Sequence, residues 1–576
     1  MRRKMMTSLV ALILVVVVVV VVVVSSSYNI NCHSRDLLLS YSETLTLALN
    51  STVPQALHEA SNHALAELPR DPRRRRRRRS VPHEAVLLPD WEALVLLPSG
   101  ANGGGGEEAS CLFSNGAASP ARFAGSVPSS GRAAYRCVLP GGVRRLRPFR
   151  SPRLVLPGGD GAAGEEPSPE MLRWNRLAYE SLSTPDDVVV FAKGVNTRSA
   201  AAAAEVRCVY YSVHGGAAPS SSAAAAISAA QEVFRCPHPP PSPSPSPSPS
   251  LEVGAELRVS LATGAADATP IPSLASYRPP RAPPAHGSPA APRSLICACT
   301  MVYNAAKFLG EWVAYHAAIG VERFFLYDNA SDDDEEEGPL AAAIRRLSSA
   351  GHRVSSRYWP WPKTQEAAFS HCAAAHRDAC RWMAFVDVDE FVFSPDWAGS
   401  PRPNRSMLGS LLPVRPNIGQ VSMGCYEFGP SGLSAHPKPG VTQGYTCRRR
   451  AAERHKSVVR LDAVDRSLAN SVHHFSLRKG FRTRRVGTVR VNHYKYQAWD
   501  EFKVKFRRRA SAFVADWSTA VNPGSRDRTP GLGFKAIEPV GWTEMFCQVQ
   551  DFKLRDATRR WFGVAGPHGT YKMVWE

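Results

Sequence analysis

The sequence predicts an α/β fold for the part of the chain that begins near Ser294, with a mainly parallel central sheet. Short apolar segments with the length of buried strands alternate there with longer segments of helical periodicity, in the order β-α-β-α-β-α-β. Two of the strand-like segments end in acidic residues. Open α/β sheets usually bind ligands at the carboxyl ends of their strands, so this edge is the predicted site.

Each element of this order has its own signal. The predicted strands before the central one cover residues 295–301, 321–327 and 353–359, and the first of them is a candidate for a buried strand. Asn304 is a suitable N-cap for a helix that runs to about Ala318, because apolar residues recur on one of its faces. Thr364 can cap a second helix, which we expect to run to Arg381 and to lead into the central strand.

The central strand, Met383 to Val386, ends in Asp387, Asp389 and Glu390. Two carboxylates that are two residues apart share one face of an extended backbone, and together they can hold a hard divalent cation. A solvated turn is the alternative interpretation. Phe391 to Phe393 follow at once, however, and a buried carboxylate without a partner is costly. The pattern therefore favours a metal site.

A second acidic loop follows the predicted strand 321–327 and contains Asp328 and Asp332. One acidic loop that hydrogen-bonds a nucleoside and another that holds a metal on a diphosphate make up a nucleotide-sugar-binding domain. We interpret the next acids, Asp334 to Glu337, as a solvated part of the loop.

The N-terminus predicts a membrane anchor. Arg2, Arg3 and Lys4 are basic, and residues 5–24 form an apolar segment long enough, at ~1.5 Å per residue, to cross a ~30 Å hydrocarbon layer. The positive-inside rule places residues 1–4 in the cytoplasm and the rest of the chain in a lumen, as in a type II protein. A cleaved signal peptide is the alternative, because Ser25 to Ser27 resemble a small-residue cleavage site.

Residues 25–80 are interpreted as a stem. They contain the run Arg73 to Arg79, which contributes to a net charge of +20 for the chain. A block of like charge is usually solvated. No aromatic-interleaved basic motif accompanies the run, so we expect no nucleic-acid partner.

Residues 81–269 predict a β-rich domain interrupted by low-complexity insertions, including the Pro-Ser repeat at 241–250. A Pro-rich linker at 270–293 separates this domain from residues 294–576. In a lumenal domain, Cys111 with Cys137 and Cys208 with Cys236 predict two disulfides. Zinc is a weaker alternative, because the nearby histidines lack the spacing of a zinc finger.

Four more cysteines lie around the predicted sheet. Cys372 and Cys380 share the second predicted helix, roughly 12 Å apart, which is too far for a disulfide between them. Cys297 and Cys299, on one strand, are also poorly placed to pair with each other. We expect all four to be core thiols or partners of other cysteines.

Several short motifs occur in an order that resembles glycosyltransferase family 92, a group once described as a domain of unknown function, which includes plant β-1,4-galactan synthases. The resemblance covers roughly Ser294 to Phe552. Its motifs include C-T-M-V-Y-N at 299–304, Y-D-N-x-S-D at 327–332, F-x-D-x-D-E-F at 385–391, F-G-P-S-G at 428–432, E-R-H-K-S at 453–457, H-H-F at 473–475 and N-H-Y at 492–494. Residues 191–196 resemble the preceding region of plant members, whose N-terminal part resembles a carbohydrate-binding module.

The resemblance implies a GT-A-type fold, an inverting mechanism and a type II Golgi protein with a lumenal catalytic domain. It implies that Asp387 and Asp389 bind Mn²⁺ or Mg²⁺ on the diphosphate of a UDP-sugar. His493 resembles the additional ligand that such folds supply from near the C-terminus, and an imidazole favours manganese. An ordinary core histidine is the alternative for His493.

Inversion requires a base for the acceptor hydroxyl, and the resemblance offers Glu427 and Glu453 without deciding between them. Glu453 could instead form a salt bridge with Arg454 or Lys456. These two cations are expected to clamp phosphate, with Asp328 and Asp332 near the nucleoside. His473 and His474 are further candidates to line the site.

The expected activity is transfer of galactose from UDP-galactose to a cell-wall polysaccharide of the β-1,4-galactan type. Transfer of another sugar, or transfer to a glycoprotein glycan, is the first alternative, and a non-catalytic carbohydrate-binding protein is the second. Homo-oligomerisation through the membrane segment or the front domain is compatible with the sequence.

Overall fold

The computed structural model describes most of the chain beyond the predicted stem. The described residues are 80–81, 84–98, 109–156, 168–195, 205–212, 222–240, 257–264, 269–280, 292–331, 338–504, 538–566 and 571–576. The predicted anchor at 5–24, the arginine run, the Pro-Ser repeat and Asp332 lie outside them. The chain divides into two units, Met1–Arg75 and Arg76–Glu576, and everything described belongs to the second. None of the described helices has the length and apolar character needed to span a membrane.

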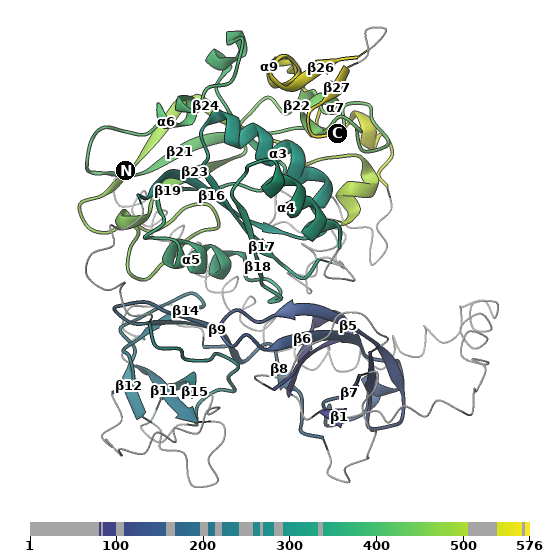
Figure 1. Ribbon diagram of the computed structural model, residues 1–576, viewed down its shortest axis with the longest axis vertical. Helices are drawn as coiled ribbons and strands as arrows, with labels where there is room; N and C mark the ends of the chain where they lie inside the picture. Colours follow the sequence, from purple (N-terminus) through teal and green to yellow (C-terminus); the bar gives the residue numbers. More distant parts are fainter. Residues whose placement is uncertain are drawn as a thin grey trace, which may run out of the picture. The chain divides into compact units, whose positions relative to one another are not determined.

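An eight-stranded sheet forms the centre of the C-terminal part (Figure 1), in the order β18-β17-β16-β19-β23-β21-β24-β20. Its first half is the predicted parallel sheet. The strands there are β16 (Ser294–Val302), β17 (Arg323–Asp328), β18 (Val354–Tyr358) and β19 (Cys380–Phe385). This half confirms the predicted alternation of strands and helices.

The second half corrects the expectation of a mainly parallel sheet. Its strands are β20 (Glu390–Phe393), β21 (Ile418–Glu427), β23 (Arg454–Arg460) and β24 (Arg482–His493). β19 with β23, β23 with β21, and β24 with β20 are antiparallel, whereas β21 and β24 are parallel. The physical reason is connectivity, because no long helix links β20, β21, β23 and β24 to one another as helices link the first four strands.

Helices cover both faces of the parallel half (Figure 1). α3 (Ala306–Ile319) and α4 (Pro339–Ser349) pack with Ile296 and Ala298 of β16 on one face. α5 (Gln365–Ala375) packs with the intervening cysteines of β16 on the other face. Because successive side chains of a strand point to opposite faces, burial on both sides explains the nearly continuous apolar pattern.

The ends of the predicted helices need correction. α5 ends at Ala375 rather than Arg381, and Cys380 belongs to β19, where pairing with β16 and β23 overrides helical periodicity. The N-cap of α3 is Ala305 rather than Asn304. Thr364 is the N-cap residue of α5 as predicted, but its side chain makes no capping bond. Its hydroxyl accepts from the Trp359 indole N–H at 2.8 Å and donates to the Trp361 carbonyl at 2.7 Å.

Five disulfides join the described residues. Cys111–Cys137 and Cys208–Cys236 are the two expected pairs. The four cysteines of the sheet region find partners on other elements, with Cys297 bonded to Cys380 and Cys299 bonded to Cys372. The fifth pair, Cys447–Cys547, was not predicted. β16 is thus linked covalently both to β19, which leads to the acidic turn, and to α5.

The preceding residues are built from strands, arranged in sheets of eight, four and three. The largest has the order β1-β7-β4-β5-β6-β3-β2-β8. Its strands are β1 (Ser80–Val81), β2 (Glu84–Leu88), β3 (Glu92–Leu96), β4 (Ser110–Leu112), β5 (Ala118–Ser126), β6 (Ala133–Val138), β7 (Arg153–Val155) and β8 (Leu172–Arg173). The four-stranded sheet contains β9 (Leu177–Ser183), β10 (Val188–Lys193), β13 (Ser228–Ala230) and β14 (Val233–Cys236). The three-stranded sheet contains β11 (Val206–Ser212), β12 (Ser222–Ala225) and β15 (Leu257–Thr263).

Short elements complete the C-terminal part. They are α6 (Ser406–Gly409), α7 (Val441–Gly444), β22 (Cys447–Arg448), β25 (Val549–Gln550), α9 (Lys553–Phe562), β26 (Gly563–Ala565) and β27 (Tyr571–Met573). Trp359 and Trp361 are fully buried.

A buried carboxylate on α3 holds the start of α7. Glu311 accepts hydrogen bonds from the backbone N–H groups of Val441 at 2.7 Å and Thr442 at 3.0 Å, and also from the Thr442 hydroxyl. Burial raises the pKa of Glu311 to about 7, although these donors oppose the shift. Gly440 packs directly against this carboxylate with φ of 111°. No side chain fits between them.

We predict that Gly440→Ala destabilises the fold by about 1–3 kcal/mol, because the new methyl group overlaps the Glu311 carboxylate. Gly351→Ala is the matched control. Gly351 also has a positive φ, of 88°, but open space surrounds it. The control variant therefore loses only the free energy of unfolding that backbone strain costs. Urea unfolding of both variants measures the difference. Equal losses of unfolding free energy in Gly440→Ala and Gly351→Ala would contradict the role assigned to Glu311.

Candidate active site

The acidic turn lies between β19 and β20, at the edge where the parallel strands end. The Glu390 N–H donates to the Asp387 carbonyl at 3.0 Å, and the Asp387 N–H donates to Glu390 Oε2, also at 3.0 Å. Glu390 is fully buried, and Asp389 is 4% exposed. The Gln365 amide, at the start of α5, donates to Asp387 Oδ1 at 3.1 Å. The turn is therefore fixed by its own third acid and by the helix that follows β18.

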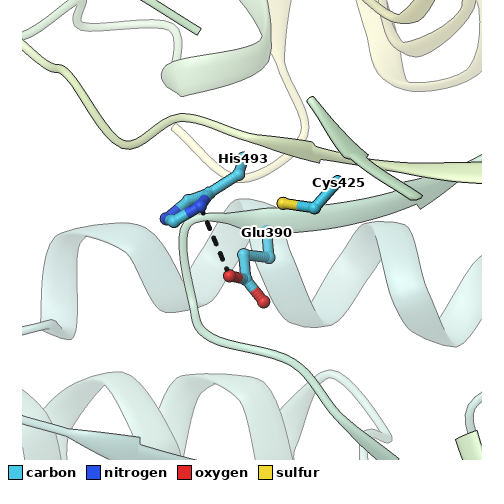
Figure 2. Close-up of side chains that lie close together, drawn as sticks. All are labelled: Glu390, Cys425 and His493. Carbon is cyan, nitrogen blue, oxygen red and sulfur yellow. Dashed lines mark ion pairs between the residues drawn. The ribbon is translucent and has the colours of Figure 1, made fainter. Parts of the chain in front are cut away.

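His493 is the last residue of β24, and it lies directly opposite Glu390 in the pairing with β20. Its Nε2 is 3.4 Å from Asp389 Oδ2. Its Nδ1 is 3.6 Å from Glu390 Oε1, and Figure 2 marks this second pair with a dashed line. Burial lowers the pKa of His493 to about 4, even though Asp389 favours the charged form. The imidazole is therefore neutral at physiological pH, which is the form that binds metals.

These residues fit a divalent cation. Asp387 and Asp389 supply oxygen ligands, and the neutral ring of His493 supplies a nitrogen beside Asp389. Among the described residues, two groups have potential ligand atoms that all lie within 4.8 Å of one another. One group is Asp387, Glu390 and His473. The other is Glu390, Cys425 and His493. Glu390 belongs to both clusters, although the sequence did not nominate it as a ligand.

Lys456 departs from its predicted role. It is 5% exposed and contacts Glu390 Oε1, while its Nζ lies 3.6 Å from Asp387 Oδ2 and 2.5 Å from His473 Nε2. Burial opposes its charge, but Glu390 and Asp387 outweigh burial and raise the pKa of Lys456. The ammonium is therefore a buried partner of the acids, and it is not free to clamp phosphate as expected.

The acids respond differently to this cation. Burial favours protonation of Asp387, but Lys456 and His473 outweigh it and hold the pKa of Asp387 below its usual value. Burial raises the pKa of Glu390 to about 8 against the pull of Lys456, with help from Asp387 and Asp389. Glu390 thus holds a proton more readily than Asp387 does.

His473 lines the site as expected. Burial lowers its pKa to about 3, and the Lys456 charge acts in the same direction. The neutral ring places Nδ1 2.7 Å from the Phe385 carbonyl, where an N–H can donate, and Nε2 then faces Lys456. His474 does not join the acidic turn, because its ring contacts His455 instead.

The two candidate bases occupy different environments. Glu427, at the end of β21, is 2% exposed and lies 2.6 Å from Lys495 Nζ and 3.4 Å from Arg449 Nη1. Burial favours its neutral form, but Lys495 outweighs burial and lowers the pKa of Glu427. Glu453 is partly exposed and pairs with Arg449 at 2.8 Å, rather than with the neighbours proposed from the sequence.

The expected nucleotide ligands are only partly described. Asp328 ends β17 at the same sheet edge as Asp387, and its Oδ1 accepts hydrogen bonds from the Ser331 N–H and hydroxyl at 2.9 and 2.6 Å. Asp332 lies outside the described residues. Arg454, at the start of β23, is exposed.

Sequence reasoning missed the contributions of Glu390 and Cys425. Cys425 is a buried free thiol two residues before Glu427 on β21, and burial raises its pKa well above the usual range. The signal for both residues is strand register. β20 and β21 both lie beside β24, which ends in His493, and no local pattern in the sequence reveals that arrangement.

Comparisons with known proteins agree on one family. The model of glycosyltransferase family 92 matches residues 293–519. A glycosyltransferase family 92 protein of Oryza sativa subsp. japonica is 40% identical over 422 residues, which cover 70% of this chain and 68% of that protein. Another, from Arabidopsis thaliana, is 39% identical over 395 residues, with 66% of each chain covered.

Two further similarities are weaker. A galactan β-1,4-galactosyltransferase of Arabidopsis thaliana is 29% identical over 106 residues, which cover 18% of this chain and 20% of that protein. Among solved structures, a mannosyltransferase from Pyrobaculum calidifontis in complex with GDP-mannose and Mn²⁺ matches 41% of this chain and 66% of its own, with 13% identity and a TM-score of 0.24. A TM-score of 0.24 is too low to assign a shared fold.

We predict that Lys456→Gln lowers the unfolding free energy by about 3–5 kcal/mol, because it leaves buried carboxylates without their cation. Adding Mn²⁺ should restore more stability to this variant than it adds to the parent chain, because a bound ion replaces the lost charge. Thermal unfolding with and without Mn²⁺ tests both points. Arg460→Gln is the control, since Arg460 pairs with the half-exposed Asp462 and its loss costs about 1 kcal/mol or less.

Proposed function

Because this chain belongs to glycosyltransferase family 92, we propose that it transfers galactose from UDP-galactose to a β-1,4-galactan-type cell-wall polysaccharide, with inversion at the transferred carbon. The short match to a galactan β-1,4-galactosyltransferase supports this choice of donor and acceptor. The apolar segment at residues 5–24 supports a type II anchor in the Golgi membrane with a lumenal catalytic domain. GT-A is the fold type that we propose for residues 294–576.

The observation that carries this proposal is the placement of the partly exposed Asp387 and the buried Asp389 and His493 at one edge of the sheet, with His493 Nε2 3.4 Å from Asp389 Oδ2. Two carboxylates and a neutral imidazole suit Mn²⁺, with Mg²⁺ as the second choice because it prefers oxygen ligands. When bound, the ion supplies Lewis-acid stabilisation of the charge on a sugar-nucleotide diphosphate. The protein holds these ligands in place through Glu390 and Gln365.

Glu453 is the residue that we propose as the base. It is partly exposed and pairs with a single arginine, Arg449, so an acceptor hydroxyl can approach it. Glu427 is buried between Lys495 and Arg449, and its lowered pKa makes it a weaker proton acceptor. In this proposal Glu427 positions Arg449 and Lys495, and Glu453 takes the proton of the acceptor.

We predict that the double change Asp387→Asn with Asp389→Asn lowers transfer by at least about 10³-fold, because both oxygen donors for the cation lose their charge. Transfer from a panel of UDP-sugars to β-1,4-galactan oligomers measures this effect, and isothermal titration with Mn²⁺ measures ion binding directly. Asp378→Asn is the matched control, because it removes a carboxylate whose side chain is 85% exposed. Unchanged transfer in the double variant would overturn the proposed mechanism.

The donor panel also separates the alternatives. Turnover with UDP-galactose alone supports the proposed substrate, and turnover with a different UDP-sugar assigns that sugar instead. Metal-dependent binding of UDP without transfer to galactan points to another acceptor, such as a glycoprotein glycan. Binding of galactan by a chain that transfers no sugar identifies a non-catalytic carbohydrate-binding protein.

We predict that Glu453→Gln lowers kcat by about 10²–10⁴-fold and leaves the KM for the donor nearly unchanged, because only proton transfer is lost. Glu427→Gln is the comparison. It should lower the melting temperature by weakening the buried pair with Lys495, and any loss of activity should follow the loss of folded protein. The opposite pattern, with kcat lost in a stably folded Glu427 variant, would make Glu427 the base.

A further inference from the structure

One member of the ligand clusters, Cys425, has no task in the proposed transfer reaction. It is 1% exposed and is the free cysteine of the described residues, all others of which form disulfides. One potential ligand atom from each of Cys425, His493 and Glu390 lies within 4.8 Å of the other two. Figure 2 shows the thiol, the ring and the carboxylate gathered in one place. A buried nitrogen, oxygen and sulfur set of this kind is typical of a site for a thiophilic metal.

Strand register fixes the three residues on one face of the sheet. β21, β24 and β20 are consecutive neighbours, and each contributes one of the residues. His493 pairs with Glu390 on one side and with Glu427 on the other, and Cys425 lies two residues before Glu427. Directly paired residues and residues two apart on a strand point to the same face. The cluster is therefore built into the backbone of the sheet and does not depend on a chance rotamer.

We propose that Cys425, His493 and Glu390 bind Zn²⁺, and that this ion inhibits the enzyme because it takes His493 from the catalytic cation. The binding part of this inference stands on the geometry alone, and the inhibition part rests on the proposed function. Thiolate, imidazole and carboxylate are all zinc ligands, and sulfur favours zinc and cadmium over manganese. Zn²⁺ and the catalytic ion thus compete for one imidazole.

The distances are close to those that zinc requires. Bonds of about 2.0–2.3 Å in a tetrahedral site place ligand atoms about 3.3–3.8 Å apart. His493 Nδ1 and Glu390 Oε1 are already 3.6 Å apart. The third atom, Cys425 Sγ, lies within 4.8 Å of a ring nitrogen of His493 and of a carboxylate oxygen of Glu390, so a movement of about 1 Å completes the site.

The charge balance also permits a cation here. Lys456 contacts Glu390 Oε1, so the ion must displace this ammonium from the carboxylate oxygen. On zinc binding, the Cys425 proton and the proton that Glu390 holds in its neutral form leave to solvent, a zinc–sulfur bond forms and no group changes its oxidation state. The Lys456 ammonium keeps partners when Glu390 turns to the metal, because Asp387 and His473 lie 3.6 and 2.5 Å from it.

Cadmium titration of the full-length chain tests binding without any assay of transfer. A cadmium–thiolate bond produces ultraviolet charge-transfer absorption, and we expect that band to saturate at one ion per chain. Cys32→Ser is the matched control, because Cys32 lies in the predicted stem and should not affect the band. Cys425→Ser should abolish it. No saturating band in the parent chain, or the same band in the Cys425→Ser variant, would overturn the zinc site.

X-ray absorption at the zinc edge of the parent chain serves as a second measurement, should Cys425→Ser fail to fold. One sulfur ligand at about 2.3 Å is the expected result, and a shell of nitrogen and oxygen ligands alone would refute the site.

Inhibition of sugar transfer is measured separately, with the Mn²⁺ concentration fixed and the Zn²⁺ concentration varied. Measured against its own rate without zinc, Cys425→Ser should raise the half-inhibiting zinc concentration at least about tenfold. Equal inhibition of both proteins would overturn the competition for His493. A chain that binds cadmium through Cys425 but transfers no sugar would leave the zinc site standing and overturn the proposed function.

Discussion

The buried ammonium of Lys456 is the interaction on which the rest of the site depends. Asp387, Asp389 and Glu390 lie within one short turn, and Glu390 has no exposure to water. Carboxylates gathered in this way repel one another and lose hydration, so they need a cation nearby. Lys456 contacts two of them at once, and the neutral His473 ring packs beside it. The acids can therefore remain together in the folded chain.

The mixed topology of the sheet explains how one edge collects these groups. β19 ends at the acidic turn, and its antiparallel neighbour β23 begins there, which brings Lys456 beside the acids. β21 runs opposite to β23 and ends at this edge with Glu427, and β24, parallel to β21, ends there with His493. β20 returns from the edge and starts with Glu390. A fully parallel sheet would carry the start of β23, and with it Lys456, to the opposite edge.

This contrast separates what the sequence could predict from what it could not. Local periodicity predicts the alternation of strands and helices, and the cost of buried charge marks the acidic turn after β19 as a site. Both features could therefore be predicted from the sequence. The role of Lys456 was misjudged because a sequence gives the residue type and not its neighbours. Cys380 was assigned to a helix because its strand is defined by pairing with β16 and β23. Register, which joins Cys425 to His493, is a long-range property.

The same charges explain why this edge suits a divalent ion. A bound cation favours the ionised form of every carboxyl, including Glu390, whose pKa burial raises to about 8. The three acids and Lys456 then carry three negative charges and one positive charge, while His473 and His493 are neutral because burial lowers their pKa values. Two negative charges remain, and a dication balances them where a monovalent ion does not. Lys456 therefore stabilises the turn and also limits its charge. Without the ammonium, the site would keep a surplus negative charge even with the ion bound, and that charge would oppose the approach of an anionic sugar nucleotide.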